Sequence, residues 1–308
     1  SVFLSLRSRS VASGVLQHVG DRDTYAATRN HVAAITTTSE PGALLWHWSQ
    51  LQSDWQPLVK ARVLGALGLA PATPPPRFYE TMSPERRAMF DTAMAEFSAL
   101  YVADLCADAS LWTRMAHTAD VGGGSGVLAS LLAQRYGMAV CVLDLDPGAV
   151  AAAKARFAQL GLATCSAHVF DMFQPRGHAE GIHAVVLKGI VSDWNDRDVV
   201  RLLTVLRQHF SAAEYFVLVD HFLHTRFQPD APAMCPVEQF KQHMDVLMFA
   251  LLDARQRTLP NMLHLAAQAG LRPVSLAEKD DKNNVPETTG LRFTAATQDM
   301  IVLAPLSS

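Results

Sequence analysis

The feature that most constrains the fold is a regular alternation of short β-like runs with helical patterns in the second part of the chain. After residue 117 the runs TADV, AVCVLDL, HAVVLKGI, YFVLVDH and DMIVLAP take turns with GVLASLLAQRYG, PGAVAAAKARFAQLG and DRDVVRLLTVLRQHF. Strands that alternate with helices favour a parallel, doubly wound sheet with helices on both faces. We therefore predict an α/β fold of the Rossmann-like class.

The composition limits the classes of function. The chain has 308 residues, of which 49% are hydrophobic, enough for one large core. Its net charge is −3 without a basic run, which argues against nucleic acid or a membrane surface as a partner. Its longest apolar stretches are shorter than the roughly 20 residues of a membrane span. Because Cys106, Cys141, Cys165 and Cys235 lack metal-ligand spacing, we expect no metal, a reducing cytoplasm and a small-molecule partner.

The first 76 residues predict a small N-terminal domain. An apolar-spaced helix precedes VLQHV and TYAAT around the turn GDRD, which is the order of a winged helix. Its helix carries only Arg7 and Arg9 and the chain is acidic, so dimerisation is favoured over DNA binding. The prolines of APATPPPR mark a linker. We predict a winged-helix domain over 1–76, a helical connector over 77–117 and the sheet domain over 118–308. Because the chain starts without Met inside a helical pattern, we expect the first domain to be partial.

The stretch DVGGGSG, residues 120–126, lies between a predicted strand and a predicted helix. A dinucleotide-binding fingerprint, GxGxxG, would need glycine where Val127 stands. The pattern instead places Asp120 before three alternating glycines, Gly122, Gly124 and Gly126, which is the DxGxGxG loop typical of S-adenosylmethionine (SAM) methyltransferases. Glycines let the backbone pass close to a ligand, and N–H groups at a helix start can bind a carboxylate.

Three further positions complete a predicted cofactor site. Asp144 ends the second strand about twenty residues after the loop, where an acidic side chain can bind both ribose hydroxyls. Asp146 competes for this role, but it precedes Pro147 and is predicted to cap the next helix. The third strand-like segment ends in HVFDMF, which places Asp171 and Met172 where the adenine is expected.

With these residues in view, the chain resembles the small-molecule O-methyltransferases of the hydroxyindole and caffeate type, which include bacterial antibiotic-biosynthesis enzymes. The matching stretches include DVGGGSG, LDLDPGAV, FDMFQP, LKGIVSDWNDRDVVRLL, VLVDHFL and MDVLMFALLDARQRTLPNMLHLAAQAGL. The resemblance implies SAM as cofactor, a winged-helix homodimer and an acceptor held between two domains, bordered by Asp245 and Met248. It also implies cofactor contacts from Gly122, Asp144, Asp171, Met172, Lys188 and Trp194.

The chain departs from this family where the general base is expected. Four residues after the lysine of its LKxxxHDW pattern the family has a histidine, and this chain has Ser192. Of the two carboxylates that usually flank that histidine, one position holds the shorter Asp220 and the other holds Asn261. The sequence therefore predicts an intact cofactor site beside altered base machinery.

Several functions remain open from the sequence. Methyl transfer to an oxygen acceptor follows from the resemblance. A thiol or thioether acceptor would need no base, because a thiol has a pKa near 8.5 and a thioether has no proton to lose. The base has alternatively moved to His221, His224 or His243. A member that binds SAM but runs a non-methylating reaction, and a non-catalytic dimerising protein, are the other candidates.

Overall fold

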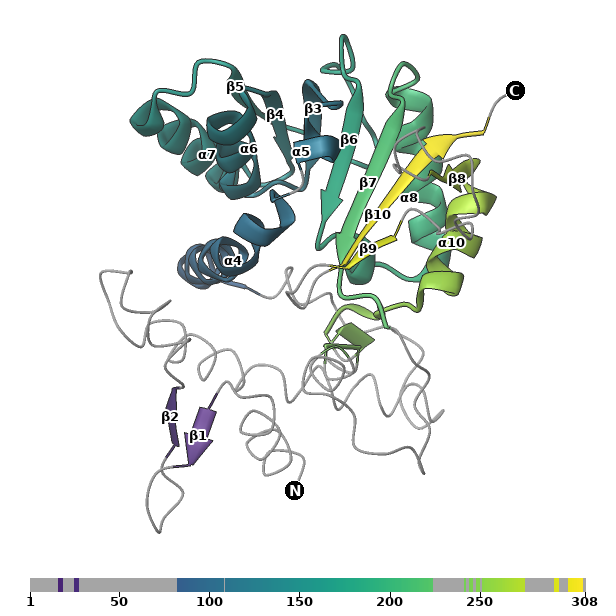
Figure 1. The fold of residues 1–308 in the computed structure, drawn as a ribbon. Coiled ribbons are helices and arrows are strands. Elements are labelled where there is room, and N and C mark those ends of the chain that lie inside the picture. The colour runs from purple at the N-terminus through teal and green to yellow at the C-terminus, as the bar shows by residue number, and fades with distance from the viewer. Residues whose placement is uncertain are drawn as a thin grey trace.

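The structure is a computed structural model that describes residues 16–18, 25–27, 82–107, 109–223, 241, 244–245, 248–249, 251–274, 291–293 and 299–306. Its centre is an eight-stranded sheet (Figure 1). Seven strands follow one another in the order β5 (Cys165–Val169), β4 (Ala139–Asp144), β3 (His117–Val121), β6 (Ala184–Lys188), β7 (Tyr215–Asp220), β10 (Asp299–Pro305) and β8 (Leu271–Pro273). The eighth, β9 (Leu291–Phe293), pairs with β10. The strands predicted from the β-like runs are confirmed, and β8 and β9 are additions.

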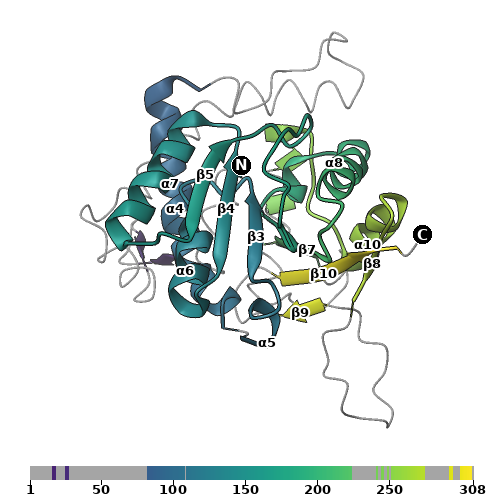
Figure 2. The same ribbon diagram turned by 90° about the horizontal axis from the view of Figure 1, so that it is seen from above.

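The described helices cover both faces of this sheet. They are α4 (Pro84–Leu105), α5 (Ala109–Trp112), α6 (Val127–Tyr136), α7 (Pro147–Leu160), α8 (Asp196–His209), α10 (Leu259–Gln268) and the 3₁₀ turn η2 (Val191–Asp193). Seen from above, α6 and α7 lie on one side of the sheet, and α8 and α10 lie on the other (Figure 2). This arrangement confirms the doubly wound Rossmann-like class.

The sheet is parallel only in part. Strands β5, β4, β3, β6 and β7 are parallel neighbours, whereas β10 runs antiparallel to β7, β8 and β9. A parallel neighbour needs a crossover connection that returns the chain to the starting edge of the sheet. Strand β10 instead enters at the edge where β7 ends, with Asp299 opposite Asp220. The predicted parallel pairing therefore holds from β5 to β7, and the sheet becomes antiparallel at β10.

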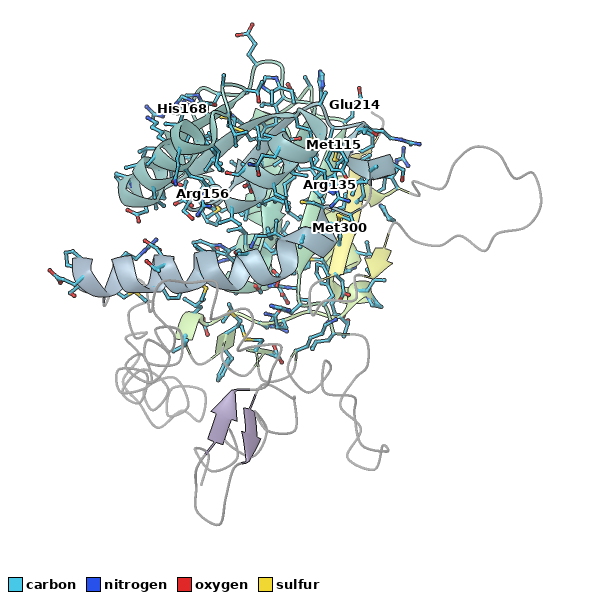
Figure 3. All side chains as sticks on the ribbon, turned by 60° about the vertical axis from the view of Figure 1, so that its left-hand side comes forward. Met115, Arg135, Arg156, His168, Glu214 and Met300 are labelled. Carbon is cyan, nitrogen blue, oxygen red and sulfur yellow. The ribbon has the colours of Figure 1, made fainter. Side chains whose placement is uncertain are left out.

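The core divides into two clusters because alternate residues of each strand face opposite sides. In β6, Val185 and Leu187 pack with the α8 and α10 side chains, while Ala184 and Val186 pack with those of α4, α6 and α7. The second cluster also joins Met115 and Met300, labelled in Figure 3, which come from distant parts of the sequence. These two layers hold the strand ends in fixed positions.

The N-terminal part is described only as an antiparallel pair, β1 (Leu16–His18) with β2 (Tyr25–Ala27). The pairing agrees with the predicted hairpin, but the helix of the expected winged helix and the linker lie outside the described residues. The predicted connector contains α4 and α5, and β3 begins at His117, one residue before the expected boundary. The domain division stays a prediction. Within the described ranges, no helix has the length and apolar character needed to cross a membrane.

Candidate functional site

Charged side chains lie at the carboxyl ends of the parallel strands, along one side of the sheet that is called the edge of the sheet below. In sheet order they are Asp144 of β4, Asp120 of β3, Lys188 of β6, Asp220 of β7 and Asp299 of β10. Three of these carboxylates, those of Asp120, Asp220 and Asp299, are almost completely buried. In doubly wound sheets, ligands bind outside the carboxyl ends of the strands. This edge is therefore the candidate site.

The glycines of the loop between β3 and α6 have two different roles. A Cβ atom on Gly122 would collide with the Ile190 side chain, and one on Gly126 would lie 2.8 Å from Cζ of Phe157. These two glycines allow close packing. Gly124, at φ +54°, has nothing within 4 Å of its Cβ position, and its N–H donates to Oδ2 of Asp144 at 2.9 Å. The middle of the loop therefore presents bare backbone to open space.

Asp120 is the most unusual ionisable group of the site. Its side chain is 2% exposed, and its Oδ2 atom has no hydrogen-bond partner among the described residues. Burial raises the pKa of its carboxyl from 3.8 to about 7, an effect that Lys188 opposes and Asp144 reinforces. A buried acceptor without a partner is costly. A hydrogen-bond donor or a cation beside Oδ2 would remove this cost.

Asp144 lies against the glycine loop. Its Oδ2 accepts the Gly124 N–H and its Oδ1 accepts the Asp146 N–H, each at 2.9 Å. A carboxylate oxygen has two lone pairs, so each oxygen can accept one further hydrogen bond. Asp146 accepts the Gly148 N–H at 3.0 Å and occupies the N-cap of α7. The prediction that Asp146 caps this helix is therefore confirmed.

An apolar wall follows strand β5. Oδ1 of Asp171 accepts the Phe173 N–H at 2.8 Å, which closes a short turn. Met172 is half-buried against the core, and the Phe173 ring meets the Trp194 ring edge-on, with centroids 4.4 Å apart. The segment after β5 thus contacts the Ser192 turn through Phe173 and Trp194, and Met172 packs against the same core cluster. Sequence reasoning missed Phe173, although FDMF shows an aromatic residue directly after the predicted adenine contacts.

Lys188 joins the sheet edge to the helical connector. Its ammonium donates to Oγ of Ser98 in α4 at 2.9 Å. Burial lowers the pKa of Lys188 below its usual value, against the opposing effects of the Asp120 and Asp220 carboxylates. The ends of β6 and β7 point toward the side on which α4 lies (Figure 1). Ser98 was not predicted as a site residue, because nothing in its local pattern distinguishes it from other polar residues of α4.

The turn that carries Ser192 is held through its main chain. Ser192 is buried, and its N–H donates to Oδ2 of Asp220 at 3.1 Å. The other oxygen of Asp220 accepts the N–H of His221 at 2.8 Å. With its side-chain amide turned to face the same carboxylate, Gln256 donates to Oδ1 at 3.2 Å. Asp220 therefore anchors backbone, where the family pattern has a carboxylate beside an imidazole.

The other predicted catalytic residues are only partly brought together. His221 is buried and directly follows Asp220. Asn261 is exposed in the first turn of α10, and its N–H donates to Oγ1 of the Thr258 N-cap. His224 and His243 lie outside the described residues. Ser192, Asp220 and His221 thus form one group, and Asn261 stands on a separate, exposed turn.

The two predicted acceptor residues lie in different surroundings. Oδ1 of Asp245 accepts the Gln256 N–H at 2.8 Å, and burial raises the pKa of its carboxyl. Met248 is buried in a small cluster that includes Leu251 and, from the α4 side, Phe90. Asp245 is therefore tied to the segment before α10, and Met248 helps to join its own helical segment to α4.

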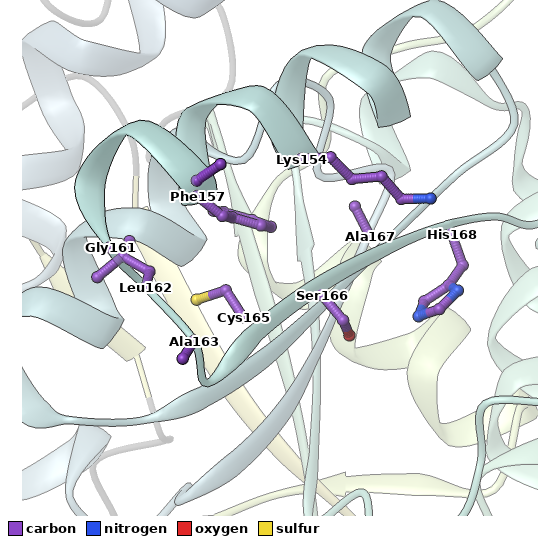
Figure 4. A pocket seen from close by; sticks show the side chains of 10 residues that line it. Lys154, Phe157, Gly161, Leu162, Ala163, Cys165, Ser166, Ala167 and His168 are labelled. Carbon is purple, nitrogen blue, oxygen red and sulfur yellow. The ribbon is translucent and has the colours of Figure 1, made fainter.

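A surface hollow lies away from this edge. It has a volume of about 510 Å³ and opens between α7 and the outermost strand, β5, with Lys154, Phe157 and His168 among its lining residues (Figure 4). None of the predicted site residues lines it. In the part of the chain that the structure describes, no three His, Cys, Asp or Glu side chains are grouped so that they could hold a metal ion.

Comparison with known proteins adds a family context to this geometry. The sequence model of one protein family, the O-methyltransferase domain, matches residues 70–272. A 2,7-dihydroxy-5-methyl-1-naphthoate 7-O-methyltransferase of Streptomyces carzinostaticus is 29% identical over 198 residues, which are 63% of this chain and 55% of that protein. An aclacinomycin 10-hydroxylase of Streptomyces purpurascens is 28% identical over 205 residues, 65% of this chain and 52% of that protein. The chain spans about half the length of these curated relatives.

Solved structures share the fold. An O-methyltransferase from neocarzinostatin biosynthesis, solved with S-adenosylmethionine and 2-hydroxy-5-methyl naphthoic acid, superposes with a TM-score of 0.64 at 21% sequence identity. The superposition covers 98% of this chain and 84% of that one.

Proposed function

Because the chain belongs to the O-methyltransferase domain family, we propose that it transfers a methyl group from SAM to an oxygen atom of a small-molecule acceptor. The observation that carries the proposal is the buried Asp120 carboxylate at the start of the glycine loop, whose Oδ2 has no partner among the described residues. A buried anion is stabilised by a nearby positive charge. The ammonium and sulfonium groups of SAM are positive charges of this kind.

The surrounding residues fit the rest of the cofactor. Bare backbone at Gly124 allows close approach, and each Asp144 oxygen keeps a lone pair for a ribose hydroxyl. Met172 and Trp194 offer an apolar wall for the adenine. Gly122 and Gly126 support the site through the close packing of the loop. We assign the cofactor site to the residues expected from the sequence: Asp120, Gly122, Gly124, Gly126, Asp144, Asp171, Met172, Lys188 and Trp194.

Methyl transfer here depends on positioning. The bound cofactor supplies an electrophilic methyl group on a sulfonium. Asp120 and Lys188 fix the charges on the cofactor side, and the Ser192 turn borders the acceptor side. Holding two reactants in line contributes up to about 7–11 kcal/mol, whereas a positioned base contributes roughly 10²–10⁴ in rate. Loss of the base histidine is therefore compatible with activity.

The acceptor we propose is an acidic hydroxyl on an aromatic ring. A serine hydroxyl does not take up a further proton near neutral pH, so Ser192 is a poor general base. Both oxygens of Asp220 already accept main-chain N–H groups. An acceptor that ionises readily needs neither group as a base. One relative is named as a dihydroxynaphthoate O-methyltransferase, and dihydroxynaphthoates carry hydroxyl groups on aromatic rings.

The cofactor assignment is tested by calorimetric titration with SAM and S-adenosylhomocysteine. Asp144→Ala removes hydrogen bonds to a charged acceptor, worth roughly 1.5–3 kcal/mol each, so affinity should fall tenfold or more. Asp146→Ala is the matched control, because it removes the helix cap two residues away and should lower stability by about 1 kcal/mol without changing affinity. Equal affinities for the Asp144 variant and the unaltered protein would refute the assignment.

The reaction is tested by measuring S-adenosylhomocysteine release with a panel of acceptors. The panel contains hydroxylated naphthoates, simple phenols and thiols, each at several pH values. Release with an aromatic hydroxyl is the expected result. Release with thiols alone would favour sulfur methylation, and a product that gains oxygen instead of methyl would point to chemistry like that of the named hydroxylase relative.

We also infer that the protein acts as a homodimer through its N-terminal region. The inference rests on the family resemblance of that region, of which the structure describes the β1/β2 pair. Light scattering on the complete natural chain should give twice the monomer mass. A stable monomer in that experiment would contradict the inference.

A further inference from the structure

Arg257 is a buried cation that none of the steps above uses. Its side chain is 1% exposed, and in the sequence it directly precedes Thr258, the N-cap of α10. Burial lowers the pKa of its guanidinium, and the neighbouring Asp196 opposes that effect. Arginine is seldom buried unless its donors are paired. The partners of this guanidinium therefore indicate why it is there.

Three of its acceptors lie in the turn that carries Ser192 and at the start of the helix that follows, and a fourth, at 3.3 Å, is the carbonyl oxygen of the nearby Arg255. The guanidinium donates to the carbonyl oxygen of Val191 and to that of Trp194, each at 2.7 Å, and to Oδ1 of Asp196 at 2.9 Å. These acceptors lie at the two ends of η2 and in the first turn of α8. A residue more than sixty positions away in the sequence thus closes the turn from outside.

One peptide group is held at both of its polar atoms. The carbonyl oxygen of Val191 accepts from Arg257 at 2.7 Å, and the N–H of Ser192, on the same peptide, donates to Asp220 at 3.1 Å. Both bonds involve an ionised partner, and such bonds are shorter and stronger than neutral ones. Because the peptide group is planar, fixing its oxygen and nitrogen also fixes the position of the Ser192 Cα atom.

The same segment connects the two halves of the proposed site. Gln256, the residue before Arg257, donates its N–H to Asp245 on the acceptor side. Trp194, whose carbonyl Arg257 binds, packs edge-on against Phe173 on the cofactor side. A displacement of the guanidinium would therefore move the cofactor wall and the Ser192 turn together.

We propose that Arg257 is a positioning residue that, opposite Asp220, clamps the Val191–Ser192 peptide and so places Ser192 and Trp194 relative to cofactor and acceptor. The role in turnover rests on the proposed methyl transfer, whereas the placement of the turn does not. Misplacement of reacting groups by about 1 Å costs on the order of 10²-fold in rate. Loss of the clamp should therefore reduce turnover far more than its effect on stability would suggest.

The first test measures placement without any acceptor. The protein is labelled with 5-fluorotryptophan, and fluorine resonances are assigned with Trp194→Phe and Trp112→Phe. In Arg257→Met the Trp194 resonance should shift or broaden, with and without bound S-adenosylhomocysteine. The Trp112 resonance should stay in place, because its indole N–H binds the Leu105 carbonyl on the other face of the sheet. An unchanged Trp194 resonance would overturn the proposal even if methyl transfer is confirmed.

The second test measures turnover with the acceptor found in the panel. Arg257→Met should lower kcat about 10²-fold, and Arg257→Lys, which keeps the charge but not the planar fork, should retain an intermediate rate. Arg207→Met is the matched control. Its guanidinium also binds a carbonyl, that of Ala269 at 2.8 Å, but at the far end of α10, so kcat should stay within twofold at a similar loss of melting temperature.

The outcomes separate the two proposals. An Arg257→Met enzyme that turns over like Arg207→Met would contradict the positioning role. An unaltered enzyme that produces no S-adenosylhomocysteine with any acceptor would contradict the proposed function, while the fluorine measurement would still decide the clamp. If Arg257→Met does not fold, Arg257→Lys replaces it in both tests, and an unshifted Trp194 resonance in that variant again overturns the proposal.

Discussion

The glycine loop and the Ser192 turn lie at the same edge of the sheet, but they differ in how their polar groups are hydrogen-bonded. In the loop, an oxygen of Asp120 has no partner among the described residues, and Gly124 faces open space. In the turn, the Val191 carbonyl and the Ser192 N–H are both bound by fully buried charged side chains. Under the proposed function, the unpartnered polar atom beside the loop serves the cofactor, whereas the hydrogen bonds of the turn fix the position of the turn itself.

This contrast has a consequence for mechanism. A group that already holds two hydrogen bonds is less available as a proton acceptor than one that holds none. Under the proposed function, the cofactor side would act through charge and the turn through placement. Three substitutions test this contrast.

Asp120→Asn should produce the largest change. The folded pKa of Asp120 is about 7, above the usual 3.8, so the folded protein holds a proton that the unfolded chain has released between these pH values. Stability is therefore lost as pH rises from about 4 to 7, and the ionised, folded form is destabilised by about 4 kcal/mol. The asparagine variant should remove this slope, so its unfolding free energy at pH 8 should exceed that of the unaltered protein.

The same substitution should affect cofactor binding in the opposite direction. SAM affinity of the unaltered protein should rise with pH through about 7, because the ionised carboxylate attracts the positive cofactor. The variant should bind more weakly above pH 7 and show no such rise. Denaturant titrations and calorimetry from pH 5 to 8 measure both effects. A flat stability profile in the unaltered protein would show that Asp120 already has a compensating partner.

Asp220→Asn should have the next largest effect, because it breaks the turn from the side opposite Arg257. An asparagine oxygen can replace one carboxylate oxygen, but its amide group then faces the second N–H donor. Breaking such a buried charged arrangement costs about 3–5 kcal/mol, which denaturant titration should detect. Asp196→Asn is the control. Asp196 is 43% exposed, and an asparagine oxygen in its place can still accept from Arg257, so this substitution should cost clearly less stability than Asp220→Asn. Similar losses in both variants would mean that Asp220 is not a special anchor.

Ser192→Ala should have the smallest effect. The main-chain bonds of residue 192 stay in place, so kcat should remain within a few-fold when an acidic phenol is the acceptor. Its rate should follow the ionisation of the acceptor. A base at His221 would instead produce a break near pH 6.5, and His221→Ala would then cost about 10²–10⁴ in rate. Complete loss of turnover in Ser192→Ala with intact SAM binding would show that the hydroxyl itself binds the acceptor or a water.

The local pattern of the sequence was sufficient for the loop region. The predicted strands and helices from β3 to α8 are confirmed, as is the cap at Asp146, because periodicity, proline and glycine act over a few residues. The replacement of the family's histidine by Ser192 could also be read from the sequence, because recognising it requires only the residue type at one motif position. The roles assigned to the cofactor residues remain proposals.

The tertiary structure alone decided how the turn is held and how the sheet ends. Ser192 and Asp220 are 28 positions apart and Val191 and Arg257 are 66 apart, and no local pattern links them. Burial of Arg257, the bond from Lys188 to Ser98 and the antiparallel entry of β10 likewise depend on which segments the fold brings together. Hydrogen bonds that act over such separations form only after the chain has packed, so the sequence named the residues and the packing assigned their partners.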